Sequence, residues 1–224
     1  MNPLLQAYTY ATNNPDEVLN ALGEHALLVG VPIAIGLLLG LPLGLWSARS
    51  RLASFTLINT FNGLRTIPSL AILFLAIPYF GLSFQSAAIA LTLLVMPPIL
   101  ISTDVAFRTL DPMVQEAARG MGMNPWQVLT QVEIPLAFPV ILSGIKTALV
   151  EVIASATLAA FIGAGGLGVF IVLGFALYDV SILLVGAIPV ALLALLAEVV
   201  LGSLQRRSQP MRSAKTTPKL MSGN

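Results

Sequence analysis

Long apolar stretches separated by short polar connections dominate the chain. A membrane-spanning helix needs about 20 mostly apolar residues. Five stretches meet this requirement, at residues 26–46, 54–80, 84–103, 137–162 and 180–204. Lipid offers the backbone no hydrogen-bond partner, so helices are the economical structure at these lengths. The pattern therefore predicts an all-α, polytopic membrane helical bundle with about five transmembrane helices.

The second stretch leaves the number of spans open between five and six. It contains Pro68, which removes a helical hydrogen bond and can break the helix. Residues 54–80 are then either one long, broken span or two short helices.

Positive charges favour five spans and set an orientation. Cytoplasmic connections are enriched in Lys and Arg. Nine of the eleven basic residues lie in three alternate connections: Arg49, Arg51, Arg108, Arg119, Arg206, Arg207, Arg212, Lys215 and Lys219. Five spans place the N-terminus outside and the C-terminus in the cytoplasm, whereas six spans break this pattern. We expect residues 1–25 to form an external amphipathic segment, residues 26–204 the transmembrane domain, and residues 205–224 a flexible cytoplasmic tail.

The amino-acid composition indicates that lipid, and not water, surrounds most of this chain. Hydrophobic residues make up 57% and charged residues 9%, whereas soluble domains carry about 25% charged residues. The net charge of +1 gives no sign of nucleic-acid binding, and there is no cysteine to form a disulfide or a metal site. His25 is the only histidine, so we expect no metal set and place this side chain at the membrane interface.

The connection between the third and fourth spans, residues 105–136, predicts two short helices. Asp111 followed by proline is typical of a helix start, and Gly122 can end that helix. Asn124, with a glutamine three residues later, has the capping-box pattern of a second helix start. Pro135 is then expected to separate this pair from the fourth span.

The first of these helices has an apolar stripe of small residues. The apolar positions with helical spacing are Val114, Ala117, Ala118 and Met121. We expect alanines on the exposed face to let a cytoplasmic partner approach closely, with Glu116 and Arg119 fixing its orientation. The alternative is an amphipathic loop without a partner, as any membrane protein can have.

The same connection resembles the cytoplasmic loop signature of permeases of binding-protein-dependent ABC importers. That pattern is Glu-Ala-Ala, three residues, Gly, nine residues, Ile, one residue and Leu-Pro. The matching positions are Glu116, Ala117, Ala118, Gly122, Val132, Ile134 and Pro135, with Val in place of Ile and Ile in place of Leu. The resemblance implies a coupling loop that seats in a groove of a separate ATP-binding subunit and carries its closing motion to the membrane helices.

The resemblance also implies the rest of the assembly. Such permeases act in the bacterial cytoplasmic membrane with a second permease chain, two ATP-binding subunits and a soluble substrate-binding protein. ATP and Mg²⁺ would be bound by the ATP-binding subunits, and this chain would have no catalytic residue and no cofactor. An intramembrane enzyme would need a convergent nucleophile and base, or a metal set, which the scattered carboxylates do not provide.

Two further stretches resemble one group of these importers. Residues 64–83 and 156–168 look like segments of permeases for glycine betaine, carnitine and choline. Permeases for methionine share parts of both stretches, so an amino-acid importer is the alternative. A transporter or channel that works without ATP is a further alternative, although it needs no loop of this pattern.

Charged residues inside the spans are candidates for the transport pathway. Arg65, Pro68 and Glu151 are the candidate pathway or gate positions, because charges in a membrane usually face water or the bundle interior. Alternatively, Arg65 forms a structural ion pair with Glu151 or Glu198.

Three other features have simpler interpretations. Asp104 and Arg108, one turn apart, are expected to be a solvated helical pair. Glycines spaced by four, Gly36, Gly40 and Gly44, favour close helix packing. The glycine-rich stretch at 163–168 follows a span and not a strand, so we expect a flexible external loop and no dinucleotide site.

Overall fold

The computed structural model describes residues 2–208, and this part of the chain contains helices and turns but no strand. The elements are α1 (Pro3–Asn13), α2 (Pro15–Arg49), α3 (Arg51–Arg65), α4 (Ser69–Phe80), α5 (Phe84–Arg108), α6 (Pro112–Gly120), α7 (Pro125–Gln127), the π-helical turns η1 (Val128–Glu133), α8 (Ile134–Ser155), the 3₁₀ segment η2 (Ala156–Ile162), α9 (Gly168–Ala176) and α10 (Val180–Ser208). The predicted all-α class is confirmed.

Four helical stretches are long and apolar enough to cross a membrane. They are α2, α5, the continuous stretch from α7 to η2, and α10. Helices α3 and α4 also qualify when taken together, but they meet at an angle of 97°. The break lies at Pro68, whose extended backbone caps α4. The described residues therefore provide four spans, or five if the bent pair α3–α4 counts as one.

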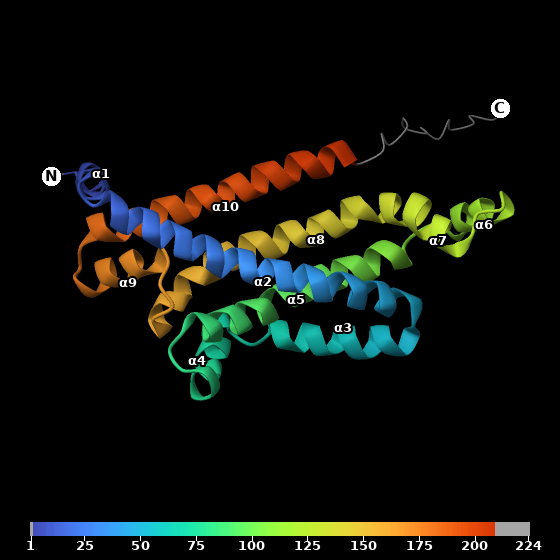
Figure 1. The fold of residues 1–224 in the computed structure, drawn as a ribbon, viewed down its shortest axis with the longest axis horizontal. Coiled ribbons are helices and arrows are strands. Elements are labelled where there is room, and N and C mark those ends of the chain that lie inside the picture. The colour runs from blue at the N-terminus through green and yellow to red at the C-terminus, as the bar shows by residue number, and fades with distance from the viewer. Residues whose placement is uncertain (1, 209–224) are drawn as a thin grey trace, which may run out of the picture.

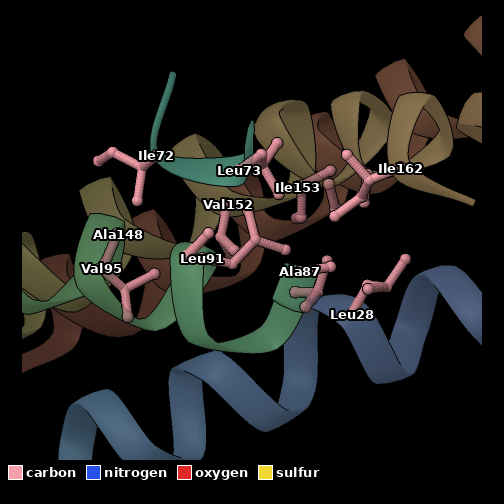
Figure 2. Close-up of a cluster of buried hydrophobic side chains, with 14 of the residues drawn as sticks. Leu28, Ile72, Leu73, Ala87, Leu91, Val95, Ala148, Val152, Ile153 and Ile162 are labelled. Carbon is pink, nitrogen blue, oxygen red and sulfur yellow. The ribbon is translucent and has the colours of Figure 1, made fainter. Parts of the chain in front are cut away.

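Helix α5 lies at the centre of the bundle. It packs against α2, α8 and α4. In its most apolar stretch 61% of the residues are buried, compared with 11% in the corresponding stretch of α10. Figure 2 shows side chains of α5, including Leu91 and Val95, between Leu28 of α2 and Val152 of α8. The apolar surface of α10 instead remains mostly open, as expected of a helix that faces lipid.

The glycines spaced by four allow α2 to lie directly against α5. A Cβ atom built at Gly36 or Gly40 would come within 2.7 Å of Val95 or 2.9 Å of Ile99. At Gly44 it would lie 2.5 Å from the Cβ atom of Thr103. The predicted packing role is confirmed, and the structure identifies α5 as the partner.

The segments at the N-terminal end of the bundle differ from the prediction. Residues 2–25 contain α1 and the first turns of α2, which begins at Pro15, and α1 packs against α10. A short helix, α9, follows the glycine-rich stretch, where only a loop was predicted. Its nine residues are fewer than the roughly 20 that a membrane span needs, so its length gave no sign of a helix.

Two further expectations, one about His25 and one about the glycine-rich stretch, are wrong. His25 is fully buried inside the bundle and does not reach its surface, since Gly166 packs against it. The glycine-rich stretch is held in place and is not a free loop, because the Gly166 N–H donates to a carboxylate oxygen of Glu24 at 2.8 Å. Gly163, Gly165 and Gly166 all have the positive φ that glycine adopts without strain.

The predicted tail begins inside a helix. Residues 205–208 form the last turn of α10, and residues 209–224 lie outside the described part of the chain.

Candidate functional site

Helix α6 and the turn after it have the local structure that the sequence predicts. A side-chain oxygen of Asp111 accepts a hydrogen bond from the Met113 N–H at 2.9 Å and caps the helix start. At the other end, the N–H groups of Gly122 and Met123 donate to the carbonyls of Arg119 and Ala118. This pair of bonds is a Schellman motif, which requires the left-handed φ of 86° found at Gly122.

The second helix starts as predicted but is not separated from the fourth span. The Asn124 N–H donates to the Gln127 side-chain oxygen and the Gln127 N–H donates to the Asn124 side-chain oxygen, each at 2.9 Å, and these two bonds form the capping box. Helix α7 then continues through the π-helical turns of η1 into α8, so the separation expected at Pro135 is wrong. Proline clashes with the carbonyl four residues earlier in a regular α-helix. The wider π-helical turns before Pro135 relieve that clash.

The exposed surface of this unit is not made of alanines. Ala117 is exposed, but Ala118 is 2% exposed and is covered by the rest of the fold. The large side chains that project to solvent are Met113, Met121 and Trp126, each more than 70% exposed. Methionine adapts its shape to a partner, and exposed tryptophan is a frequent centre of binding energy in protein interfaces. We name these three side chains, with Glu116, the coupling face, after the contact that the loop signature predicts.

The remaining signature residues connect the coupling face to the membrane helices. Val132 is half-buried in η1, whereas Ile134 and Pro135 are exposed at the start of α8. Between them lies Glu133, which is buried and forms an ion pair with Arg49 at the end of α2. Glu133 is not among the residues predicted from the sequence, although it lies inside the signature. The ion pair joins the start of the fourth span to the first.

A second polar network joins α2 to α5 close to this ion pair. The Ser47 hydroxyl donates to Asp104 at 2.7 Å, and Arg108 binds both the Asp104 carboxylate at 2.8 Å and the Ser47 carbonyl at 2.9 Å. Asp104 is only 4% exposed. The predicted helical pair of Asp104 and Arg108 is confirmed, but its carboxylate is not solvated, because α2 packs over α5 at this level and covers it.

A polar cavity of about 280 Å³ lies between the two networks and α6. Arg49, Arg108 and Arg119 line it, together with Gln115 and Glu133. The helix that presents the coupling face thus lies across this cavity from charged groups that belong to α2, α5 and η1, and it packs directly against η1.

The ion pair between Arg49 and Glu133 should make a measurable contribution to stability. We expect Arg49→Ala to lower the free energy of unfolding by about 1–2 kcal/mol. A fully buried pair costs about 3–5 kcal/mol to break, and half of Arg49 is exposed to solvent, which weakens the pair. Thermal melting of the purified protein checks this, with Arg51→Ala as the control on a neighbouring exposed arginine.

A double variant separates pairing from packing. Adding Glu133→Leu to Arg49→Ala should recover most of the loss, because no buried carboxylate is then left without its partner. A melting temperature unchanged by Arg49→Ala would contradict the role assigned to the pair.

The candidate pathway residues come together at the break between α3 and α4. Arg65, in the last turn of α3, lies with its guanidinium 3.8 Å from a carboxylate oxygen of Glu151 on α8. Pro68, at the break, is the N-cap of α4. Glu198 pairs instead with Lys146 at 2.7 Å. Of the two partners considered for Arg65, the structure selects Glu151, and both side chains remain more than one third exposed.

Comparisons with known proteins agree with this arrangement. Residues 36–210 match the family model described as "Binding-protein-dependent transport system inner membrane component". The chain is 41% identical over 202 residues to the carnitine transport permease protein OpuCB of Listeria monocytogenes, covering 90% of this chain and 93% of that protein. It is 36% identical over 205 residues to the glycine betaine/carnitine/choline transport system permease protein OpuCB of Bacillus subtilis, covering 92% and 94%.

A solved structure has the same fold. It is an inward-facing form of the MetNI methionine ABC transporter, with a TM-score of 0.74 at 23% identity, covering 87% of this chain and 97% of that one. The family predicted from the loop signature is therefore confirmed, and this chain belongs to the binding-protein-dependent transport system inner membrane components.

Proposed function

We propose that this chain is the permease subunit of an ATP-driven importer for quaternary-ammonium osmoprotectants such as glycine betaine, carnitine and choline. The single observation that carries the substrate class is the similarity, at 36–41% identity over at least 90% of this chain, to permeases named for these compounds. The methionine transporter has the same fold, but its sequence is only 23% identical to this chain. Osmoprotectants are therefore favoured over methionine.

The coupling face is the proposed contact with a separate ATP-binding subunit. Its methionines and tryptophan suit a hydrophobic groove, and Glu116 supplies a charge for orientation. ATP and Mg²⁺ belong to that subunit, so this chain contributes binding and movement but no bond-making chemistry. Binding of ATP favours one conformation of the assembly, and the ion pair of Arg49 and Glu133 passes the movement of α6 to the first and fourth spans.

The arginines support an orientation with the coupling face in the cytoplasm. The turn between α2 and α3, the pair α6–α7 and the C-terminal end of α10 all lie toward one end of the molecule, and α1, α4 and α9 lie toward the other (Figure 1). The first end carries Arg49, Arg51, Arg119, Arg206 and Arg207. The positive-inside rule then places the N-terminus outside.

The break between α3 and α4 is the proposed position of the gate. Pro68 prevents a continuous helix there, and the ion pair of Arg65 with Glu151 joins the broken span to α8 across a loose contact of 3.8 Å. One Glu151 oxygen is buried without a hydrogen-bond partner among the described residues. A pair held this loosely can open at little cost. A second permease chain, identical or similar, would complete the pathway, and a soluble binding protein would deliver the substrate.

Uptake by the reconstituted assembly tests the proposal. The chain is placed in proteoliposomes with the ATP-binding and substrate-binding proteins encoded beside it, and uptake of radiolabelled glycine betaine, carnitine, choline and methionine is measured. We expect ATP-dependent uptake of at least one quaternary-ammonium compound and none of methionine. Uptake of methionine alone would overturn the substrate class, and full uptake without ATP would overturn the ATP-driven mechanism.

A further inference from the structure

A cavity of about 360 Å³ lies at the end of the bundle opposite the coupling face. Helix α1, the first turns of α2 and the start of α9 line it and leave one side open, and these three elements lie together at the N-terminal end of Figure 1. Its size falls within the range of small-molecule sites, about 300–1,000 Å³. The coupling and gating roles proposed above use none of its residues.

Two aromatic rings form one corner of this cavity. The rings of Tyr10 and Phe170 have centroids 6.1 Å apart and planes inclined at 79°. Phe170 is 5% exposed and therefore fixed by packing, and the Tyr10 hydroxyl donates to a carboxylate oxygen of Glu17 at 3.2 Å. The aromatic corner is thus held in place before any ligand binds.

Two carboxylates add negative charge to the aromatic corner. Glu17 and Glu24 both line the cavity, and each has one oxygen engaged, in bonds to the Tyr10 hydroxyl and the Gly166 N–H. Their second oxygens are left for a ligand. Among residues 2–208, those that line this cavity include no lysine or arginine to neutralise them. The cavity therefore favours a cation that also has apolar surface.

We propose that this cavity binds a trimethylammonium group, with Tyr10 and Phe170 against the methyl groups and Glu17 and Glu24 supplying the counter-charge. Quaternary ammonium groups are held by aromatic rings through cation–π attraction, and they have no N–H, so they need no hydrogen-bond acceptor. The choice of ligand rests on the proposed function, since the same group is present in the proposed cargo. The group can come from a free solute or from the headgroup of phosphatidylcholine.

Equilibrium binding of radiolabelled choline to the full chain tests the site. The chain is placed in nanodiscs of phosphatidylethanolamine and phosphatidylglycerol, without its partner proteins. We expect saturable binding that Tyr10→Leu and Glu17→Gln each weaken about fivefold or more. Tyr8→Leu is the matched control, because Tyr8 is an exposed tyrosine on the same helix outside this cavity, and it should bind as the unchanged chain does.

Competition identifies what is recognised. The uncharged isostere 3,3-dimethylbutan-1-ol should not displace choline, whereas tetramethylammonium should. Weaker choline binding in nanodiscs that contain phosphatidylcholine would identify the lipid headgroup as a ligand, and equal binding would identify the free solute.

Three outcomes would overturn the site: no saturable binding, equal displacement by the uncharged isostere, or binding unchanged in both cavity variants. The uptake experiment is independent of these outcomes. If uptake of osmoprotectants occurs but choline does not bind here, the proposed site is refuted and the proposed function stands. If choline binds here but only methionine is transported, the proposed function is refuted and the proposed site stands.

Discussion

Replacing Gly44 by valine should prevent the bundle from assembling. The new Cβ atom would lie 2.5 Å from the Cβ atom of Thr103 and 2.7 Å from the Leu100 carbonyl oxygen. The second of these is backbone and cannot rotate away, so α2 would have to move off α5. Overpacking costs about 1–3 kcal/mol even where side chains can adjust, and the buried network at Ser47 and Asp104 lies next to this contact. We expect loss of the monodisperse peak in size-exclusion chromatography of the purified protein.

The matched control lies on the same helix. Gly30 has no atom within 4 Å of a built Cβ atom, so Gly30→Val should purify and melt like the unchanged protein. A Gly44→Val protein that purifies and melts normally would contradict the close contact of α2 with α5.

Replacing Gly122 by valine should uncouple the permease from the proposed ATP-binding subunit. A β-branched residue is strained at a φ of 86°, so the Schellman motif would open and α6 would change its angle to α7. Because nothing lies within 4 Å of a built Cβ atom, the membrane helices should be unaffected. We expect a tenfold or greater loss of ATP-dependent uptake, with loss of the ATP-binding subunit in co-purification and a normal melting temperature.

Gly120→Ala is the control for this experiment. Gly120 ends α6 with an ordinary helical φ and has free space around it, so alanine should leave uptake intact. Normal uptake and normal co-purification by Gly122→Val would argue against the coupling face. Normal uptake without a bound ATP-binding subunit would favour transport that does not use ATP.

Local features of this protein could be predicted from the sequence with good accuracy. The caps at Asp111 and Asn124 and the turn at Gly122 formed as predicted, because each depends on hydrogen bonds between residues at most five positions apart. The approximate positions of the apolar spans followed from the length of the apolar stretches, although α2 begins at Pro15 and the fourth span continues from α7. The family followed from seven signature positions within twenty residues.

Burial and pairing could not be predicted in the same way. Arg49 and Glu133 are 84 positions apart, and Ser47 and Asp104 are 57 apart, so no local pattern links them. In a membrane protein, helix surfaces that face lipid and those that face the core are both apolar. Hydrophobicity alone therefore could not place His25 inside the bundle.

The sequence by itself determined the long apolar helices, the caps of the coupling loop and the family. Only the tertiary structure decided which side chains form the coupling face, which carboxylate meets Arg65, and that α7 continues past Pro135 into the fourth span. The physical reason is that helix formation and capping depend on neighbours within one or two turns. Burial and ion pairing depend on which helices pack together, and here that packing is set by glycines of α2 that admit α5.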